Sequence, residues 1–245
     1  MSVRVIAIVP AHNEEGAIGS VVDDIRAFDP SIDVLVVDDA STDDTALVAA
    51  ERGALVVRLA ANLGIGGAVQ TGFKAALEGG YDMAVRVDGD GQHDPADIAT
   101  LLAPLERGDA DVVTGSRFLD GARRYRPPLA RRVGITWFAR LVSLLTRQRV
   151  TDTTSGFQAF NRTGISLFAH DYPTDYPEVE ATLLVLRHRL RLVEVPVVMR
   201  EREHGVSSIT FVRSVYYVLK VTLALGVAML RKVTLPEEEK ERARP

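Results

Sequence analysis

Residues 82–93, with the sequence DMAVRVDGDGQH, combine a strand signal with a cluster of polar residues. The mostly apolar segment 82–87 predicts a strand that is covered on both faces. Asp88 and Asp90 follow it directly, and the glycines between and after them allow the backbone to turn sharply. Two carboxylates held close together, with Gln92 as a neutral oxygen, suit Mg²⁺ or Mn²⁺ that bridges phosphate groups. The stretch therefore predicts a metal-binding strand end, and His93 is expected to support the site or lie at the surface rather than bind the metal.

The same order, an apolar segment followed by polar residues, repeats along the N-terminal half. Strands are expected at 3–9, 32–37, 54–59, 82–87 and 110–113. Helices are expected at 14–28, from the capping residues 41–43 to 51, from the glycine-rich loop 62–67 to 77, and at 95–107. This alternation predicts an α/β fold with a doubly wound, mostly parallel sheet and flanking helices.

Polar clusters follow four of the expected strands, at 10–15, 38–39, 88–93 and 115–117. In an open parallel sheet, ligands bind at the carboxyl ends of the strands, which share one edge. The binding crevice is therefore expected at that edge. Asp38 and Asp39 could accept hydrogen bonds there from a ribose or a base.

Composition and spacing exclude several classes of protein. The chain has 245 residues, which favours one large α/β domain or a domain with one appendage. It contains no cysteine, so disulfides, zinc–thiolate sites and thiol nucleophiles are excluded. The glycines of the 62–67 loop lack the GxGxxG spacing, and there is no GxxxxGK[ST] segment. Dinucleotide-binding proteins and P-loop nucleotide hydrolases are therefore disfavoured.

The net charge of −4 is distributed unevenly along the chain. Residues 1–116 hold 7 basic and 20 acidic residues, whereas residues 117–149 hold nine arginines and one aspartate. The basic segment includes an expected helix at 129–149. Its polar stripe consists of Arg132, Thr136, Arg140, Ser143 and Arg147, and its apolar side of Val133, Trp137, Leu141, Leu144 and Leu145.

An apolar helix face beside arginines suits a membrane surface or a lipid phosphate. A solvated helix packed on the sheet is the plainer alternative, and nucleic acid is a third. The acidic remainder of the chain and the metal site inside the sheet argue against nucleic acid.

The two ends of the chain carry weaker signals. The first apolar segment ends at Pro10 and is too short and too weakly basic for a signal peptide, so we expect a cytoplasmic protein. Residues 211–230 are long enough to cross a bilayer, but Arg213 and Lys220 lie within them and argue against a span. An amphipathic helix in the core, in a homo-oligomer interface or on a membrane surface is expected instead.

Five segments resemble, in order, the motifs of family 2 inverting glycosyltransferases with the GT-A fold. They are VPAHNEE (9–15), VDDASTD (37–43), NLGIGGA (62–68), DGDGQH (88–93) and GSRF (115–118). Two further segments, TSGFQAF (154–160) and REHGVSS (202–208), resemble the polyprenyl-phosphate (dolichol-phosphate) sugar transferase branch of that family. The resemblance covers residues 3–231. It implies a transferase that moves a sugar from a nucleotide-sugar donor to a polyprenyl phosphate.

The resemblance also implies roles for individual residues. The residues implied to hold the nucleoside are Pro10, Ala11, Asn13, Glu15 and Asp39, with Asp39 near the base. Asp88, Asp90 and Gln92 are implied to hold Mg²⁺ or Mn²⁺ and the diphosphate, whereas Arg117, Arg202 and Ser207 are implied to lie over the phosphates. Gly67, Arg131 and Arg200 are further substrate-binding candidates. The chain departs from the family at His12, where a tyrosine is usual, and at Ser208, where a lysine is common, so phosphate neutralisation depends more on Arg200 and Arg202.

The expected catalytic residues are Asp90, Arg117, Arg202 and Glu178. A phosphate monoester acceptor is already anionic and needs no strong general base. A sugar-hydroxyl acceptor would need one, and the candidates are Asp152, Glu178 and Glu180. Glu178 and Glu180 could equally supply charge at the start of a helix.

The resulting hypothesis is a metal-dependent, inverting transfer to polyprenyl phosphate by a peripheral protein on the cytoplasmic face of the membrane. The alternatives are a glycosyltransferase that extends a polysaccharide or glycan, and a nucleotidyltransferase. The expected organisation is a catalytic domain at 1–205, with a nucleotide-binding half (1–116) and an acceptor half (117–205). An amphipathic helix at 206–232 and a disordered tail at 233–245 complete it.

Overall fold

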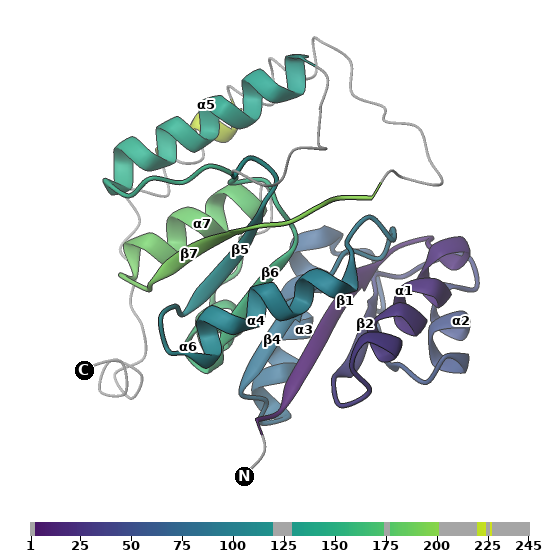
Figure 1. Cartoon of the computed structure of the whole chain (residues 1–245). Helices are drawn as coiled ribbons and strands as arrows, with labels where there is room; N and C mark the ends of the chain where they lie inside the picture. The colour runs from purple at the N-terminus through teal and green to yellow at the C-terminus, as the bar shows by residue number, and fades with distance from the viewer. Residues whose placement is uncertain (1–2, 120–128, 174–176, 201–219, 224–225, 227–245) are drawn as a thin grey trace.

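The strands form because short apolar segments can be buried on both faces of one sheet. A computed structural model describes residues 3–119, 129–173, 177–200, 220–223 and 226. Its sheet has seven strands in the order β3-β2-β1-β4-β6-β5-β7. They are β1 (Val5–Ala11), β2 (Asp33–Asp38), β3 (Leu55–Arg58), β4 (Met83–Arg86), β5 (Val112–Ser116), β6 (Gln158–Asn161) and β7 (Leu192–Pro196). Only β6 among them runs antiparallel to its neighbours, β4 and β5. The predicted mostly parallel α/β sheet is therefore confirmed (Figure 1).

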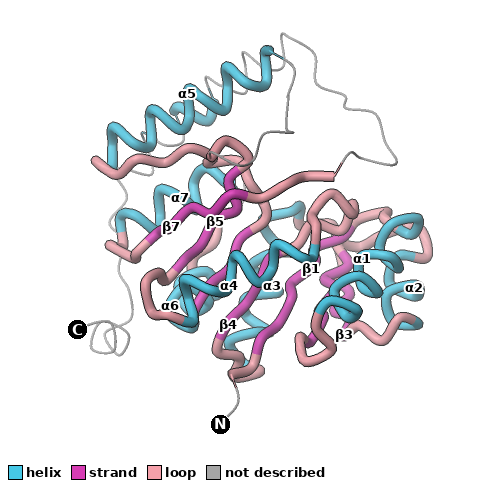
Figure 2. Tube along the Cα trace, in the orientation of Figure 1, coloured by secondary structure: helices cyan, strands magenta, loops and turns pink. Residues whose placement is uncertain are grey.

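Helices cover both faces of the sheet (Figure 2). They are α1 (Glu15–Phe28), α2 (Thr45–Glu51), α3 (Gly64–Glu78), α4 (Ile98–Glu106), α5 (Leu129–Thr146), α6 (Arg162–His170) and α7 (Pro177–Arg187), with a 3-10 turn, η1 (Pro95–Asp97), before α4. Ile6 and Ile8 of β1 belong to the core layer that includes α3, α6 and α7. Ala7 and Val9 belong to the opposite layer, with α1 and α4. Because side chains alternate along a strand, β1 anchors both layers and the doubly wound arrangement follows.

Several boundaries differ from those expected, most clearly those of α3 and β5. Helix α3 begins at Gly64, so most of the expected 62–67 loop is helical. The early start is stabilised because Asp39 Oδ1 accepts the Leu63 N–H at 2.7 Å and Asn62 Oδ1 accepts the Gly64 N–H at 3.0 Å. Strand β5 lies two to three residues later than the expected 110–113, because Gly115 N–H donates to the Phe157 carbonyl at 2.9 Å. Strands β6 and β7 were not expected from their short segments.

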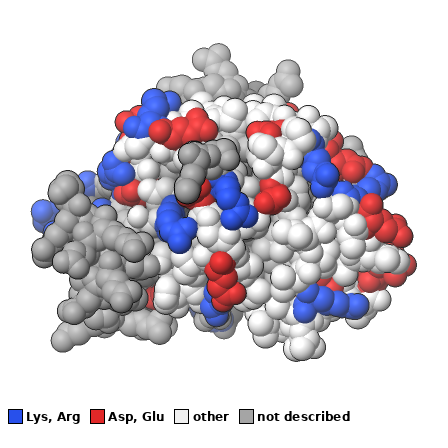
Figure 3. All heavy atoms as spheres, turned by 90° about the horizontal axis from the view of Figure 1, so that it is seen from below, with Lys and Arg blue, Asp and Glu red and all other residues white. Residues whose placement is uncertain are grey.

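The basic helix α5 lies at one end of the molecule, away from α1 and α2 (Figure 1). Ile135, Phe138 and Val142 are buried, whereas the residues Val133, Trp137, Leu144 and Leu145 on the expected apolar side are exposed. The helix is therefore apolar on two faces, one of which is packed. On the face of the molecule shown in Figure 3, acidic and basic side chains are interspersed rather than gathered by sign.

The expected C-terminal helix at 206–232 falls mostly outside the described residues. Residues 220–223 and 226 are helical, and Trp137 Nε1 of α5 donates to Thr222 Oγ1 at 3.2 Å. The expected tail at 233–245 lies outside the description. Among the described residues, no helix combines the length and the apolar character that crossing a bilayer requires.

An aromatic cluster fills the core between α3 and α6. Phe73 is fully buried, and its ring centroid lies 4.8 Å from that of Phe160, 5.3 Å from that of Phe168 and 5.7 Å from that of Tyr172. We expect Phe73→Ala to lower the free energy of unfolding by about 3–5 kcal/mol, because it leaves a cavity at the centre of this cluster. Urea denaturation followed by circular dichroism measures the change. Phe28→Ala, at the 38% exposed end of α1, serves as the control, and an equal loss in both variants would contradict the assignment.

Candidate active site

A cavity of about 290 Å³ opens where β1, β2 and β4 end. It lies at the carboxyl edge of the sheet, as the distribution of polar clusters predicted. Its lining includes six residues expected in the site, Pro10, Ala11, Asp39, Asp88, Asp90 and Glu178, together with His12, Glu14, Ile65, Ala68, Arg86 and Gly89. The sheet topology therefore gathers residues that are far apart in sequence, from the end of β1 to the first turn of α7.

Asp88 and Asp90 form the acidic end of the cavity. Asp90 Oδ1 accepts the Gln92 N–H at 3.1 Å, a contact that closes the turn after Asp88. The side chain of Gln92 is not part of the cavity lining. In the described part of the chain, no three His, Asp or Glu side chains are grouped so that they could hold a metal ion by themselves. Two hard carboxylates fit a Mg²⁺ or Mn²⁺ ion that takes its other ligands from substrate phosphates and water.

Arg86 is the main residue of the site that sequence analysis missed. Its side chain is 1% exposed; its Nη2 donates to Glu178 Oε1 at 2.9 Å and lies 3.4 Å from Asp88 Oδ1. Its Nη1 donates to the Tyr172 hydroxyl at 3.1 Å. Burial alone would lower the pKa of Arg86, but Tyr172, Asp88 and Glu178 outweigh it and raise the pKa, so the guanidinium stays charged.

Two groups that contact Arg86, Tyr172 and Asp88, also have shifted pKa values. Burial raises the pKa of Tyr172 to about 12, so its hydroxyl stays protonated. Burial opposes ionisation of Asp88, but His93, Arg86 and Arg117 outweigh it and hold the pKa of this carboxyl below its ordinary value. The available signal in the sequence was an arginine inside the otherwise apolar segment 83–87.

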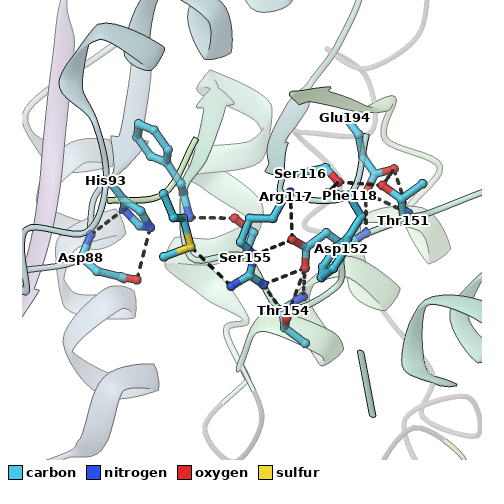
Figure 4. Close-up of polar contacts among 12 residues, drawn as sticks. Asp88, His93, Ser116, Arg117, Phe118, Thr151, Asp152, Thr154, Ser155 and Glu194 are labelled. Carbon is cyan, nitrogen blue, oxygen red and sulfur yellow. Dashed lines mark hydrogen bonds and ion pairs between the residues drawn. The ribbon is translucent and has the colours of Figure 1, made fainter. Parts of the chain in front are cut away.

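His93 lies behind Asp88, as expected, and is buried (Figure 4). The Asp88 N–H donates to His93 Nδ1 at 3.1 Å, and His93 Nε2 lies 3.6 Å from Asp88 Oδ2. The imidazole stacks on Phe157, with ring centroids 4.5 Å apart. Burial lowers the pKa of His93, in agreement with a neutral ring whose Nδ1 accepts a hydrogen bond. His93 thus orients the backbone and the carboxylate of Asp88.

The residues expected to hold the nucleoside divide into two groups. Pro10, Ala11 and Asp39 line the cavity, and His12 Nδ1 donates to the Asp39 carbonyl at 2.8 Å. Asn13 and Glu15 instead hold the segment 41–44, because Asn13 Oδ1 accepts the Thr42 N–H at 2.9 Å and Glu15 Oε2 accepts the Asp44 N–H at 3.1 Å. Asn13 and Glu15 thus support the rim of the cavity.

Arg117 forms a buried ion pair with Asp152 (Figure 4). Its Nε donates to Asp152 Oδ2 at 2.7 Å and its Nη2 to Asp152 Oδ1 at 2.8 Å; Nη2 also donates to Thr154 Oγ1 at 2.6 Å. Glu194 of β7 accepts the Thr151 and Asp152 N–H groups at 2.8 Å each. Arg117 therefore holds the segment before β6 in place, and Asp152, with both oxygens engaged, is not available as a base.

None of the other candidate residues lines the cavity in the part of the chain that the structure describes. Arg200 is paired with Asp24 at 2.9 Å and with Asp94 at 3.1 Å on the surface. Gly67 lies inside α3, and Glu180 lies in the first turn of α7; neither lines the cavity. Arg131 belongs to α5, but its side chain lies outside the description, as do Arg202 and Ser207 entirely.

The buried pair yields a prediction about stability. Asp152→Ala leaves the Arg117 guanidinium buried without its carboxylate, so we expect the free energy of unfolding to fall by about 3–5 kcal/mol. Asp109→Ala breaks a similar pair, Arg107 Nε to Asp109 Oδ2 at 2.8 Å, that is exposed, and should cost about 0–1 kcal/mol. Chemical denaturation of the two variants side by side measures the difference. Equal losses would refute the structural role of the buried pair.

Comparison with known proteins agrees with this architecture. The profile of glycosyl transferase family 2 matches residues 6–168. The chain is 35% identical over 216 residues to undecaprenyl-phosphate mannosyltransferase of Micrococcus luteus, covering 84% of this chain and 88% of the relative. It is 31% identical over 209 residues to UDP-N-acetylglucosamine–dolichyl-phosphate N-acetylglucosaminyltransferase of Methanococcus voltae, covering 78% and 83%.

A solved structure shows the same fold. Glucosyl-3-phosphoglycerate synthase of Mycobacterium tuberculosis, in complex with Mn²⁺ and UDP-glucose, aligns with a TM-score of 0.71 at 22% identity. The alignment covers 95% of this chain and 81% of the synthase. With the family profile spanning most of the sheet and the carboxylates at its carboxyl edge, the chain is a glycosyltransferase of the GT-A fold and belongs to glycosyl transferase family 2.

Proposed function

We propose that the protein transfers a sugar from a nucleotide-sugar donor to a polyprenyl phosphate, with inversion and with Mg²⁺ or Mn²⁺. The observation that carries the proposal is the cavity that joins Asp39 with Asp88 and Asp90 at the carboxyl edge of the sheet. The names of relatives matched over most of their length support the acceptor, because they are transferases to undecaprenyl and dolichyl phosphate.

On the donor side, Asp39 binds the base, and Asp88 and Asp90, with Gln92, hold the metal ion beside the diphosphate. When bound, the ion would neutralise charge that develops on the leaving nucleoside diphosphate. Mn²⁺ in the structure of the synthase with the same fold supports a divalent ion here. Arg86 Nη2, 3.4 Å from Asp88 Oδ1, helps to orient the Asp88 carboxylate in the absence of substrate.

On the acceptor side, the pairing of Glu178 favours a phosphate over a hydroxyl. Glu178 Oε1 accepts a hydrogen bond from Arg86 at 2.9 Å, so this carboxylate is already engaged with the buried guanidinium. A phosphate monoester is already anionic, so its oxygen can attack the anomeric carbon as the diphosphate leaves from the opposite side. The acceptor reaction thus requires cationic side chains rather than a base.

The candidate arginines have different roles in the proposed reaction. We assign Arg202 and Ser207 to the phosphates on the strength of the resemblance, and we keep Arg131 as a substrate-binding candidate. Arg117 and Arg200 are engaged with carboxylates in the structure. We therefore assign Arg117 a positioning role for the segment before β6, while Arg200 would have to leave Asp24 and Asp94 to reach a phosphate.

The exposed apolar side of α5 supports peripheral binding to a membrane, which we place at the cytoplasmic face. Its apolar side chains lie on the same helix as several arginines, a pattern suited to the interface of an anionic bilayer. A polyprenyl phosphate buries its chain in the bilayer and presents only its phosphate. A membrane-bound α5 would therefore bring acceptor and enzyme together.

A transfer assay tests the reaction. Nucleotide sugars with different bases and sugars are incubated with a short-chain polyprenyl phosphate and Mg²⁺ or Mn²⁺, and glycolipid is measured. Asp90→Ala is expected to reduce turnover by roughly a hundredfold or more, because the leaving diphosphate loses its stabilisation. Undiminished turnover in this variant would refute the proposed metal site.

The same assay separates the alternatives. With a phosphate acceptor, Glu178→Gln should retain most turnover, because no base is needed and the glutamine oxygen can still accept the hydrogen bond from Arg86. A loss of about a hundredfold or more, the contribution of a general base, would instead favour a sugar-hydroxyl acceptor in polysaccharide or glycan synthesis. Release of pyrophosphate would indicate a nucleotidyltransferase.

Membrane binding is tested with vesicles that contain anionic lipid. Leu144 is 77% exposed on α5, so we expect Leu144→Glu to reduce co-sedimentation with the vesicles without changing thermal unfolding. Leu47→Glu, at a 56% exposed site on α2, is the matched control. Equal binding of the wild type and Leu144→Glu would count against the proposed surface.

A further inference from the structure

In the loop 153–157, which leads into β6, the backbone at Gly156 lies in close contact with the carboxylate of Asp88. A Cβ placed on Gly156 would lie 2.6 Å from Asp88 Oδ2 and 2.7 Å from Oδ1, whereas ordinary contact begins at 3.4 Å. Gly156 is not among the glycines with positive φ. The Asp88 carboxylate therefore occupies the space that a side chain at position 156 would need, whereas the backbone conformation of Gly156 would allow one.

The Asp88 carboxylate is enclosed from other directions as well. Arg86 Nη2 lies 3.4 Å from Oδ1 and His93 Nε2 lies 3.6 Å from Oδ2. Phe157, the neighbour of Gly156, stacks on the His93 ring. Three groups thus leave the carboxylate little freedom except toward the cavity that it lines.

The loop itself is held on both sides. Thr154 N–H and Oγ1 both donate to Asp152 Oδ1, at 3.1 Å each. Arg117 Nη2 donates hydrogen bonds to both Asp152 and Thr154. Beyond Gly156, the Phe157 carbonyl accepts the Gly115 N–H at 2.9 Å, and β6 begins at the next residue. Because the loop is tied to Arg117 and to β5, an added methyl group would displace the end of the Asp88 side chain more readily than the loop.

We propose that Gly156 is a positioning residue, whose missing side chain sets where the Asp88 carboxylate points. This inference rests on the proposed function, because it assumes that Asp88 binds the metal ion beside the donor phosphates. Outer residues that orient a metal ligand are typically worth about ten- to a hundredfold in metal affinity. We expect a loss of that size in Gly156→Ala.

The first measurement titrates Mn²⁺, alone and with UDP or GDP, into the wild type and Gly156→Ala, by electron paramagnetic resonance of free Mn²⁺. The apparent dissociation constant should rise about ten- to a hundredfold in the variant. Gly19→Ala is the control, since its Cβ would meet Val48 Cγ1 at 3.2 Å between α1 and α2, outside the cavity lining. It should bind Mn²⁺ as the wild type does.

The second measurement is a double-mutant cycle in the free energy of unfolding, without metal. It compares Gly156→Ala and Asp88→Ala with the double variant. If the methyl group collides with the carboxylate, Gly156→Ala is less destabilising when Asp88 has been truncated. Additive effects in the cycle would show that the contact is absent and would overturn the inference.

The two measurements separate failure of the inference from failure of the proposed function. Coupling in the cycle with unchanged Mn²⁺ affinity in Gly156→Ala overturns the positioning role alone. A wild type that binds no Mn²⁺, with or without nucleotide, overturns the proposed metal site and the inference with it. Coupling together with weakened Mn²⁺ binding supports both.

Discussion

The buried charge of Arg86 is the constraint on which the site depends. A guanidinium withdrawn from water is costly unless carboxylates and hydrogen-bond acceptors surround it. Asp88 lies two residues further along the chain, whereas Tyr172 after α6 and Glu178 at the start of α7 come from a distant part of it. Pairing this one cation therefore ties α6 and α7 to the carboxyl edge of the sheet and closes one side of the cavity.

The fold could be predicted from local signals, because an apolar segment followed by a polar cluster marks β1, β2 and β4. Strands β6 and β7 lack this combination and are stabilised by pairing with β5. Arg86 was missed for a related reason. A single charge in an apolar segment acquires its meaning only from partners 86 and 92 residues away, Tyr172 and Glu178.

The motif residues of this site have two different roles, lining the cavity and holding the surrounding backbone, and a sequence pattern does not distinguish them. Asp39, Asp88 and Asp90 line the cavity, whereas Asn13, Glu15 and Arg117 hold the backbone that surrounds it. The first kind lies where the chemistry of the site takes place, and the second sets its geometry. The sequence could therefore identify the neighbourhood of the site, but the division of roles required the pairing of side chains across the fold.

The reversed direction of β6 has a consequence for where this chain can accept insertions. The parallel strands end at the cavity edge, whereas the antiparallel strand β6 begins there. The segment 147–157 therefore runs from α5 to the Asp88 side chain before β6 begins. Its length is set at both ends by packed elements. Insertions in this segment would shift either α5 or Asp88, whereas the turns at the opposite edge of the sheet, such as 79–82 and 107–111, can lengthen without reaching the cavity.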